Sequence, residues 1–217
     1  MSSIVRPEFG DSLPTTLGPK WRALSKLSRG LIIGAAVLIV LLLAYILAGG
    51  TSSTRSVKVA APVPFQLDYD GDLLQQRLAL GRESLRLESP AAVADKRSFA
   101  VQPLVLQPYK GSVQGVLPLQ AERLVKQMTA ADPSFITVSE GPLLIEEQPG
   151  YEILYLLSRG GQTIYGRRVL LFPAKLGERA GVDVTMTAPR SSSTLTVRVV
   201  GQQPPLREPI ETLVVGN

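Results

Sequence analysis

Two groups of acidic residues have the types and spacing that could support chemistry. The first is the run Asp68-Tyr69-Asp70-Gly71-Asp72, whose three carboxylates at alternate positions match the start of a calcium-binding loop. A complete loop of that kind needs glycine at position 73 and glutamate at position 79, where this chain has Leu73 and Ala79. We therefore interpret the run as a solvated turn and predict no metal ligands.

The second group is Glu140, Glu146 and Glu147, which could supply the acid and the base of a glycosidase. Nothing in the sequence sets the distance between them, and carboxylates in loops are usually surface charge. The chain also has no glycine-rich nucleotide-binding loop and no Ser-x-x-Lys acylation motif. No catalytic residue is predicted, and a membrane-anchored hydrolase with a carboxylate-based site is kept as an alternative function.

The residue types that the chain lacks narrow its chemistry further. Its 217 residues include no histidine and no cysteine. A Ser-His triad, thiol catalysis, a zinc thiolate site and disulfide bonds are therefore excluded for this chain. We predict that it is not an enzyme and that it uses no cofactor.

The net charge of +5 does not indicate a nucleic-acid partner. More than half of that charge lies in the first 30 residues, and the remainder of the chain is close to neutral. No stripe of lysine and arginine with interleaved aromatic residues is present, as a DNA or RNA surface would require.

The uncharged, apolar run 31–48 determines how the chain is divided. As a helix this run is about 27 Å long, which matches the hydrocarbon thickness of a bilayer. It predicts a transmembrane helix that divides the chain into four parts. These are a basic flexible tail at 1–30, the span at 31–48, an extended stalk at 49–64 and a folded domain at 65–217.

The orientation of the span follows from its flanking charges. Only Arg55 and Lys58 follow it closely, whereas four basic residues precede it: Lys20, Arg22, Lys26 and Arg29. This bias predicts a single-pass protein of the plasma membrane with its N-terminus inside and residues 49–217 outside. The alternative is a cleaved signal peptide, but the 30-residue leader and the long apolar run favour an uncleaved anchor.

One face of the predicted span consists mainly of small residues. The face is Gly30, Gly34, Val37, Leu41, Ala44 and Ala48. Small residues four positions apart allow two membrane helices to approach closely, so we hypothesise a homodimer through the span. The other interpretation is that glycine and alanine are simply common in membrane helices.

The outer domain is predicted to be α+β, with an antiparallel sheet and one or two packed helices. A helix is predicted around 117–128 from the apolar positions on one face, with Pro118 in its first turn. Turns are predicted at Pro149-Gly150 and at Gly160-Gly161, and Pro103 predicts that its strand lies at a sheet edge or is split. Alternation predicts strands at 65–70, 84–88, 98–107, 135–138, 142–145, 151–157, 163–172, 181–187 and 195–199, and the apolar pattern of 206–215 predicts a short helix.

Residues 84–215 resemble a known group of domains. The segments concerned are Gly150-Tyr151-Glu152-Ile153, the Gly160-Gly161 turn, Tyr165-Gly166-Arg167-Arg168-Val169 and the strand 182–189. Their order after one long helix resembles the PsbP/DcrB/Mog1-like domains. The resemblance implies a small, non-catalytic accessory domain of the kind that is often exported or attached to membranes.

Together these observations predict a membrane-anchored, non-enzymatic accessory or binding module, part of an envelope assembly. Its expected partners are the lipid bilayer and an envelope protein, with no nucleic acid. A small-ligand-binding domain is the second alternative, and a shallow apolar sheet edge would favour protein binding over it.

Overall fold

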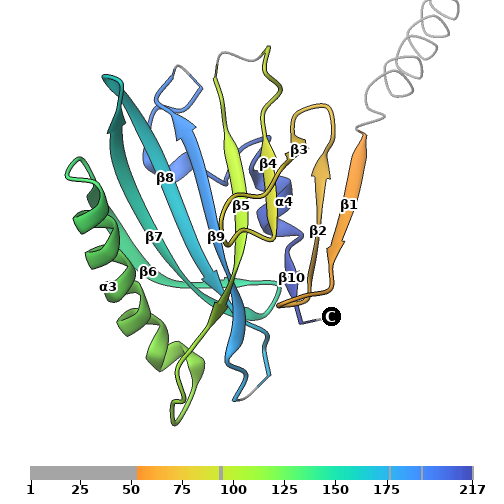
Figure 1. Cartoon of the computed structure of the whole chain (residues 1–217), viewed down its shortest axis with the longest axis vertical. Coiled ribbons are helices and arrows are strands. Elements are labelled where there is room, and N and C mark those ends of the chain that lie inside the picture. The colour runs from red at the N-terminus through yellow and green to blue at the C-terminus, as the bar shows by residue number, and fades with distance from the viewer. Residues whose placement is uncertain (1–52, 93–94, 176, 192, 217) are drawn as a thin grey trace, which may run out of the picture. The chain divides into compact units, whose positions relative to one another are not determined.

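A large antiparallel sheet forms the body of the protein in the computed structural model, which describes residues 53–92, 95–175, 177–191 and 193–216. Within these residues the sheet has seven strands in the order β3-β4-β5-β9-β8-β7-β6 (Figure 1). Its strands are β3 (Gln75–Arg77), β4 (Leu85–Glu88), β5 (Ser98–Val105), β6 (Ile136–Ile145), β7 (Gln148–Arg159), β8 (Gln162–Leu171) and β9 (Ala180–Pro189).

A smaller antiparallel sheet has the order β1-β2-β10 within the same residues. Its strands are β1 (Thr54–Val59), β2 (Phe65–Asp70) and β10 (Val214–Val215). Residues 54–59 of the predicted stalk form β1, which is paired with β2 along its whole length, with Thr54 opposite Asp70 and Val59 opposite Phe65. Part of the predicted stalk therefore belongs to the folded domain.

The predicted tail, span and helix-dimer face lie outside the described residues. Among the described residues, no helix is long and apolar enough to cross a membrane. The predicted α+β domain, with antiparallel sheets and one or two helices, is confirmed for the part of the chain that the structure describes.

The long helix α3 (Val113–Ala131) covers one face of the large sheet beside β7 and β6 (Figure 1). Its buried residues Leu117, Ala121 and Leu124 lie on the face that the apolar spacing predicted. The helix starts earlier than expected, so the placement of Pro118 in the first turn is wrong. Pro118 lies inside the helix, where it lacks the N–H for one backbone hydrogen bond.

The opposite face of the large sheet packs on the small sheet and on the C-terminal segment. Among the described residues, the larger apolar cluster lies there and includes Phe65, Phe99 and Met186, all almost completely buried. The C-terminal segment contributes helix α4 (Arg207–Glu211) and then β10, so the helix predicted over 206–215 is shorter than expected.

The strand predicted at 195–199 is wrong, because this segment forms the 3₁₀ helix η1 (Val197–Val199). The buried residues here are Thr194, Val197 and Val200, while Leu195 is 69% exposed. These buried residues are three positions apart, which is the period of a 3₁₀ helix. The apolar residues at every second position, Leu195, Val197 and Val199, led to the strand prediction instead.

Pro103 lies inside β5, opposite Val182 of β9. The pairing of β5 with β4 ends at Val101, so Pro103 lies beyond the β4 pairing and has a strand partner only on the β9 side in the described part of the sheet. β5 is nevertheless one unbroken strand between β4 and β9, so it is neither a sheet edge nor split as Pro103 predicted. The missing N–H of proline is tolerated because the β4 pairing has ended there.

The turn that joins β6 to β7 is formed by Glu146 and Glu147, not by Pro149 and Gly150 as predicted. Both glutamates have a positive φ, 47° and 64°, whereas Pro149 and Gly150 lie within β7. The segments predicted as two short strands merge into β6, with an irregularity between Thr137 and Ser139. The Gly160-Gly161 hairpin turn is confirmed, with φ of 57° and 77°.

The positive φ angles of Glu146 and Glu147 indicate that other residues in this turn would make the fold more stable. Non-glycine residues in the left-handed region cost about 1 kcal/mol each, and two-residue hairpins of this type prefer Asn-Gly. The double change Glu146→Asn and Glu147→Gly should raise the free energy of unfolding by about 1 kcal/mol in a urea titration. An unchanged or lower stability would show that the glutamate side chains stabilise the turn in another way.

Candidate functional site

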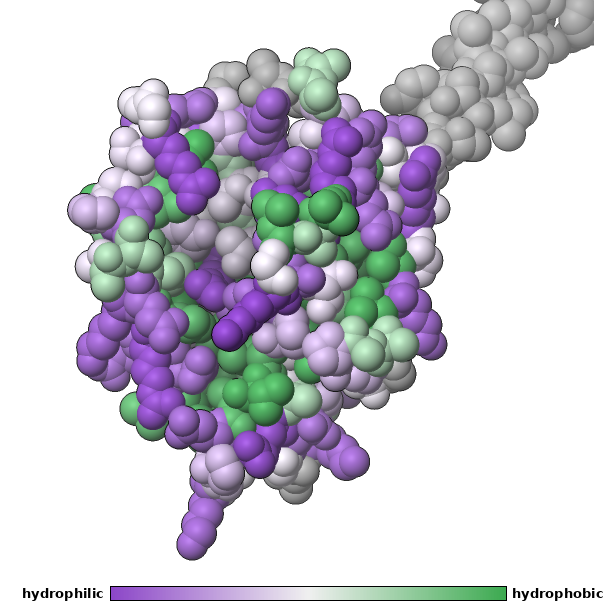
Figure 2. All heavy atoms as spheres, in the orientation of Figure 1, coloured by the Kyte–Doolittle hydropathy of each residue, from purple (hydrophilic) through white to green (hydrophobic). Residues whose placement is uncertain are grey.

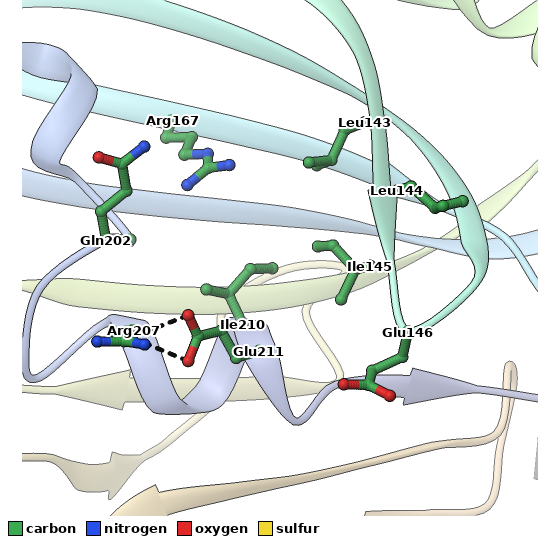
Figure 3. A pocket seen from close by; sticks show the side chains of 10 residues that line it. Leu143, Leu144, Ile145, Glu146, Arg167, Gln202, Arg207, Ile210 and Glu211 are labelled. Atoms are coloured by element: carbon green, nitrogen blue, oxygen red, sulfur yellow. Dashed lines mark hydrogen bonds and ion pairs between the residues drawn. The ribbon is translucent and has the colours of Figure 1, made fainter.

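A cleft of about 480 Å³ lies between the end of β6 and the segment that follows η1 (Figure 3). It lies on the face of the large sheet opposite α3. Its floor residue Arg167 is two positions from Tyr165 and from Val169 on β8, so it shares the face of these two core residues. Its lining residues are Leu143, Leu144, Ile145, Glu146, Arg167, Gly201, Gln202, Arg207, Ile210 and Glu211.

Arg167 is the buried charge of this cleft, with a side chain that is 10% exposed. Its Nε lies 3.0 Å from Glu152 Oε2, and its Nη1 donates to the Val200 carbonyl at 3.3 Å. The Nε–Glu152 contact is an ion pair by distance but lacks hydrogen-bond geometry. A guanidinium has five N–H groups, so this arrangement leaves donors that a bound group can use.

One wall of the cleft is apolar, and its rim is charged. Leu143, Ile145 and Ile210 lie along the wall, while Arg207 and Glu211 form a bidentate ion pair at the rim with distances of 2.8 and 2.9 Å. Figure 3 shows the guanidinium of Arg167 pointing into the space between these two parts. Arg207 donates two hydrogen bonds to Glu211, whereas the contact of Arg167 with Glu152 lacks hydrogen-bond geometry, so Arg167 is the cation best placed to meet a ligand.

The segment that follows η1 passes over Arg167 and has a glycine, Gly201, at the point of contact. Gly201 has a φ of 76°, and a Cβ there would lie 2.9 Å from Met186 Sδ and 3.1 Å from Arg167 Nη1. The absence of a side chain therefore lets the C-terminal segment lie directly against the arginine.

Beside the cleft, β6 forms one border of the large sheet, since within the described residues it pairs only with β7. Three of its apolar side chains, Ile136, Val138 and Leu144, are exposed by 58%, 47% and 63%. The irregular pairing near Thr137 and the presence of Pro142 protect this edge from uncontrolled strand pairing. Of these three residues only Leu144 lies beside the cleft, because Ile136 and Val138 are at the other end of β6.

A second, polar groove of about 220 Å³ lies on the α3 side of the sheet, over β5 and β9. Asp183, 2% exposed, accepts hydrogen bonds at 2.7 Å from Gln102 Nε2 and from Arg168 Nε, and pairs with Arg168 Nη2 as well. Figure 2 shows this side of the molecule as hydrophobic patches among hydrophilic residues. Because the carboxylate is fully paired, this network serves the sheet itself.

Tyr155 borders the same groove and provides a pH prediction. Burial raises the pKa of Tyr155 to about 12, from an ordinary value of 10.0. The unfolded chain therefore loses the phenolic proton first, and the contribution to stability is complete below pH 10 and is lost as the pH rises through about 12. Urea titrations at pH 8 and about pH 11 should show a smaller loss of stability for Tyr155→Phe than for the wild type. Equal losses would contradict the shift.

The acidic residues singled out from the sequence are not brought together. The Asp70 side chain accepts a hydrogen bond from the backbone of Asp72 at 2.8 Å, which confirms the turn at that run. Glu140 lies on β6, whereas Glu146 and Glu147 form the following turn. Among the described residues, no group of three or more acidic side chains is arranged to hold a metal ion.

The two buried arginines were missed in the sequence, although a signal for them exists. Arg167 and Arg168 are adjacent in the middle of a predicted strand, so they must point to opposite faces of the sheet. Charged side chains are rarely buried without a partner, so a charged residue on each face of an inner strand indicates one buried ion pair on each face of the sheet. The structure places Arg167 in the cleft and Arg168 in the polar groove.

No protein-family model matches the chain, and no curated protein matches its sequence. Similar solved structures include the Ran-binding protein Mog1p of Saccharomyces cerevisiae, with 10% identity, coverage of 75% of this chain and 95% of that one, and a TM-score of 0.49. Cyanobacterial PsbP from Synechocystis has 9% identity, 77% and 95% coverage and a TM-score of 0.48. LpqN, involved in cell envelope biogenesis of Mycobacterium tuberculosis, has 10% identity, 80% and 96% coverage and a TM-score of 0.48. The solved structures similar to this chain thus include a PsbP protein and Mog1p, the kinds of protein that residues 84–215 resemble in sequence pattern.

Proposed function

We propose that this chain is a single-pass, membrane-anchored accessory module that binds an envelope protein outside the cytoplasmic membrane and catalyses no reaction. The observation that carries the proposal is the combination of the exposed apolar residues of β6 with the cleft at the end of that strand. Exposed apolar residues along a border strand are typical of a surface that a partner covers, and Leu144 lies where this strand borders the cleft.

Composition supports a binding role over an enzymatic one. The chain has no histidine and no cysteine, and Glu140 lies on β6, outside the turn that Glu146 and Glu147 form. No specific observation in the described residues favours the alternative hydrolase. Anchoring is supported by the apolar run 31–48 and by the basic residues that precede it.

Photo-crosslinking tests the binding surface in cells that express the full chain. A photoreactive phenylalanine analogue at Leu144, which is 63% exposed beside the cleft, should give one discrete adduct with an envelope protein. The matched control is Leu78, which is 85% exposed and directly follows β3 at the other border of the large sheet. The same adducts from both positions, or none from Leu144, would contradict the proposed surface.

Cysteine labelling tests the anchoring, because the chain contains no native cysteine. A membrane-impermeant maleimide added to intact cells should label Leu78→Cys and should leave Ser3→Cys unlabelled until the cells are lysed. The labelled protein should keep the mass of the complete chain. A shorter protein that lacks the tail would support the cleaved signal peptide instead.

A further inference from the structure

We propose that the cleft recognises a carboxylate carried on an apolar group, and that Arg167 is the residue that binds the carboxylate. This inference rests on the proposed function and names the chemistry of its ligand. The carboxylate can belong to the C-terminus of a peptide or to a free amphiphile, since both present the same group.

The position of Arg167 separates it from an ordinary surface arginine. Its side chain is nine-tenths buried on the inner strand β8, between β7 and β9. Its Nε is buried without a properly directed hydrogen bond, and Nη1 has only a 3.3 Å contact with the Val200 carbonyl. A buried guanidinium with incompletely used donors gains from a bidentate acceptor such as a carboxylate.

The acidic residues near Arg167 determine how strongly the cleft can bind a carboxylate. Glu152 Oε2 lies 3.0 Å from Nε, so one acidic partner already balances part of the charge of Arg167. Its side chain is 29% exposed, which leaves it hydrated and able to turn toward solvent. A ligand carboxylate would therefore meet the Nη atoms of Arg167 as Glu152 turns toward solvent. Anions with more than one charge are disfavoured, because Glu146 and Glu211 also line the cleft.

The remainder of the lining indicates an apolar group next to the carboxylate. Leu143 and Ile145 approach from β6, and Ile210 approaches from α4 on the opposite side (Figure 3). A volume of about 480 Å³ accommodates a branched aliphatic side chain or a short acyl chain. A fully polar anion such as inorganic phosphate would leave this apolar wall uncovered.

The test compares carboxylates with their amides on the fragment 53–217. This fragment holds the two apolar clusters and all of the strand pairing described above, so it is expected to fold by itself. The probes are N-acetyl-leucine and N-acetyl-leucinamide for a peptide C-terminus, and octanoate and octanamide for an amphiphile. Titrations are followed by ¹H–¹⁵N NMR, including the Nε–Hε signal of Arg167.

At least one carboxylate should shift the Arg167 signal and the β6 signals, and its amide should bind about tenfold more weakly or not at all. Tight binding of N-acetyl-leucine indicates a peptide terminus, and tight binding of octanoate indicates an amphiphile. Arg167→Gln should lose this difference, whereas the control Arg86→Gln, which lies in the polar groove and not in the cleft, should keep it. The comparison of acid with amide stays informative even if Arg167→Gln does not fold.

Equal binding of each acid and its amide, or no shift at the cleft with any probe, would overturn the inference. These results are separable from failure of the proposed function. A specific adduct at Leu144 without carboxylate binding leaves the protein-binding surface intact and removes only the role of Arg167. Carboxylate binding without any adduct retains the cleft as a ligand site and removes the protein partner.

Discussion

Replacing Gly166 with alanine should lower the free energy of unfolding by about 3 kcal/mol. A Cβ at this position would lie 2.1 Å from Cζ and 2.2 Å from Cε2 of Tyr155, which stands opposite Gly166 on the neighbouring strand. The ring also packs against Phe135, with 5.1 Å between ring centroids, so it has little freedom to move away. Both strands lie inside the sheet, and their backbones are held on each side. Urea unfolding measures the loss.

A double-mutant cycle separates this clash from a general effect on the strand. In a Tyr155→Ala background the space above Gly166 is open, so Gly166→Ala should cost less than about 1 kcal/mol. The difference between the two backgrounds is the clash itself. An equal cost of Gly166→Ala with and without the tyrosine ring would contradict the packing described here.

Replacing Asp183 with alanine should cost about 3–5 kcal/mol. The change leaves Arg168 without its counter-charge, although the Arg168 side chain is only 13% exposed. It also removes the acceptor of Gln102 Nε2. An unpaired buried charge is much more unfavourable than a lost surface contact, and the loss should appear as a lower urea midpoint with an unchanged slope.

The control for this prediction is the exposed pair of Glu122 and Lys126 on α3. These side chains are 58% and 73% exposed and lie 2.6 Å apart, at a helical spacing of four. Glu122→Gln should change the stability by no more than about 0.5 kcal/mol. A similar small effect for Asp183→Ala would contradict the structural role assigned to the buried pair.

The strands of the domain were largely predictable because most of them have one face in a core. β2 alternates buried and half-buried residues throughout, and its predicted bounds match those observed. The helix face was predictable for the same reason, through Leu117, Ala121 and Leu124. Periodicity failed where a different geometry gives a similar pattern, as at Val197 and Val200 in the 3₁₀ segment.

The candidate site was less predictable than the fold, because it is built from segments far apart in the sequence. Leu143, Arg167 and Ile210 meet only after β6, β8 and α4 have packed. The turn of Glu146 and Glu147 was missed because glutamate is not a usual residue for the left-handed region. The adjacent arginines of β8 were the one local signal, and it indicated buried charge without indicating which face holds the open cleft.

The most direct test of a partner-binding surface on β6 is co-purification of the full-length protein from membranes in mild detergent, quantified by mass spectrometry. Wild type is compared with Leu144→Glu beside the cleft and with Leu78→Glu at the other border of the large sheet. We expect one stoichiometric envelope partner that is lost with Leu144→Glu and kept with Leu78→Glu. Retention of the partner by Leu144→Glu, or its loss in both variants, would contradict a binding surface on β6.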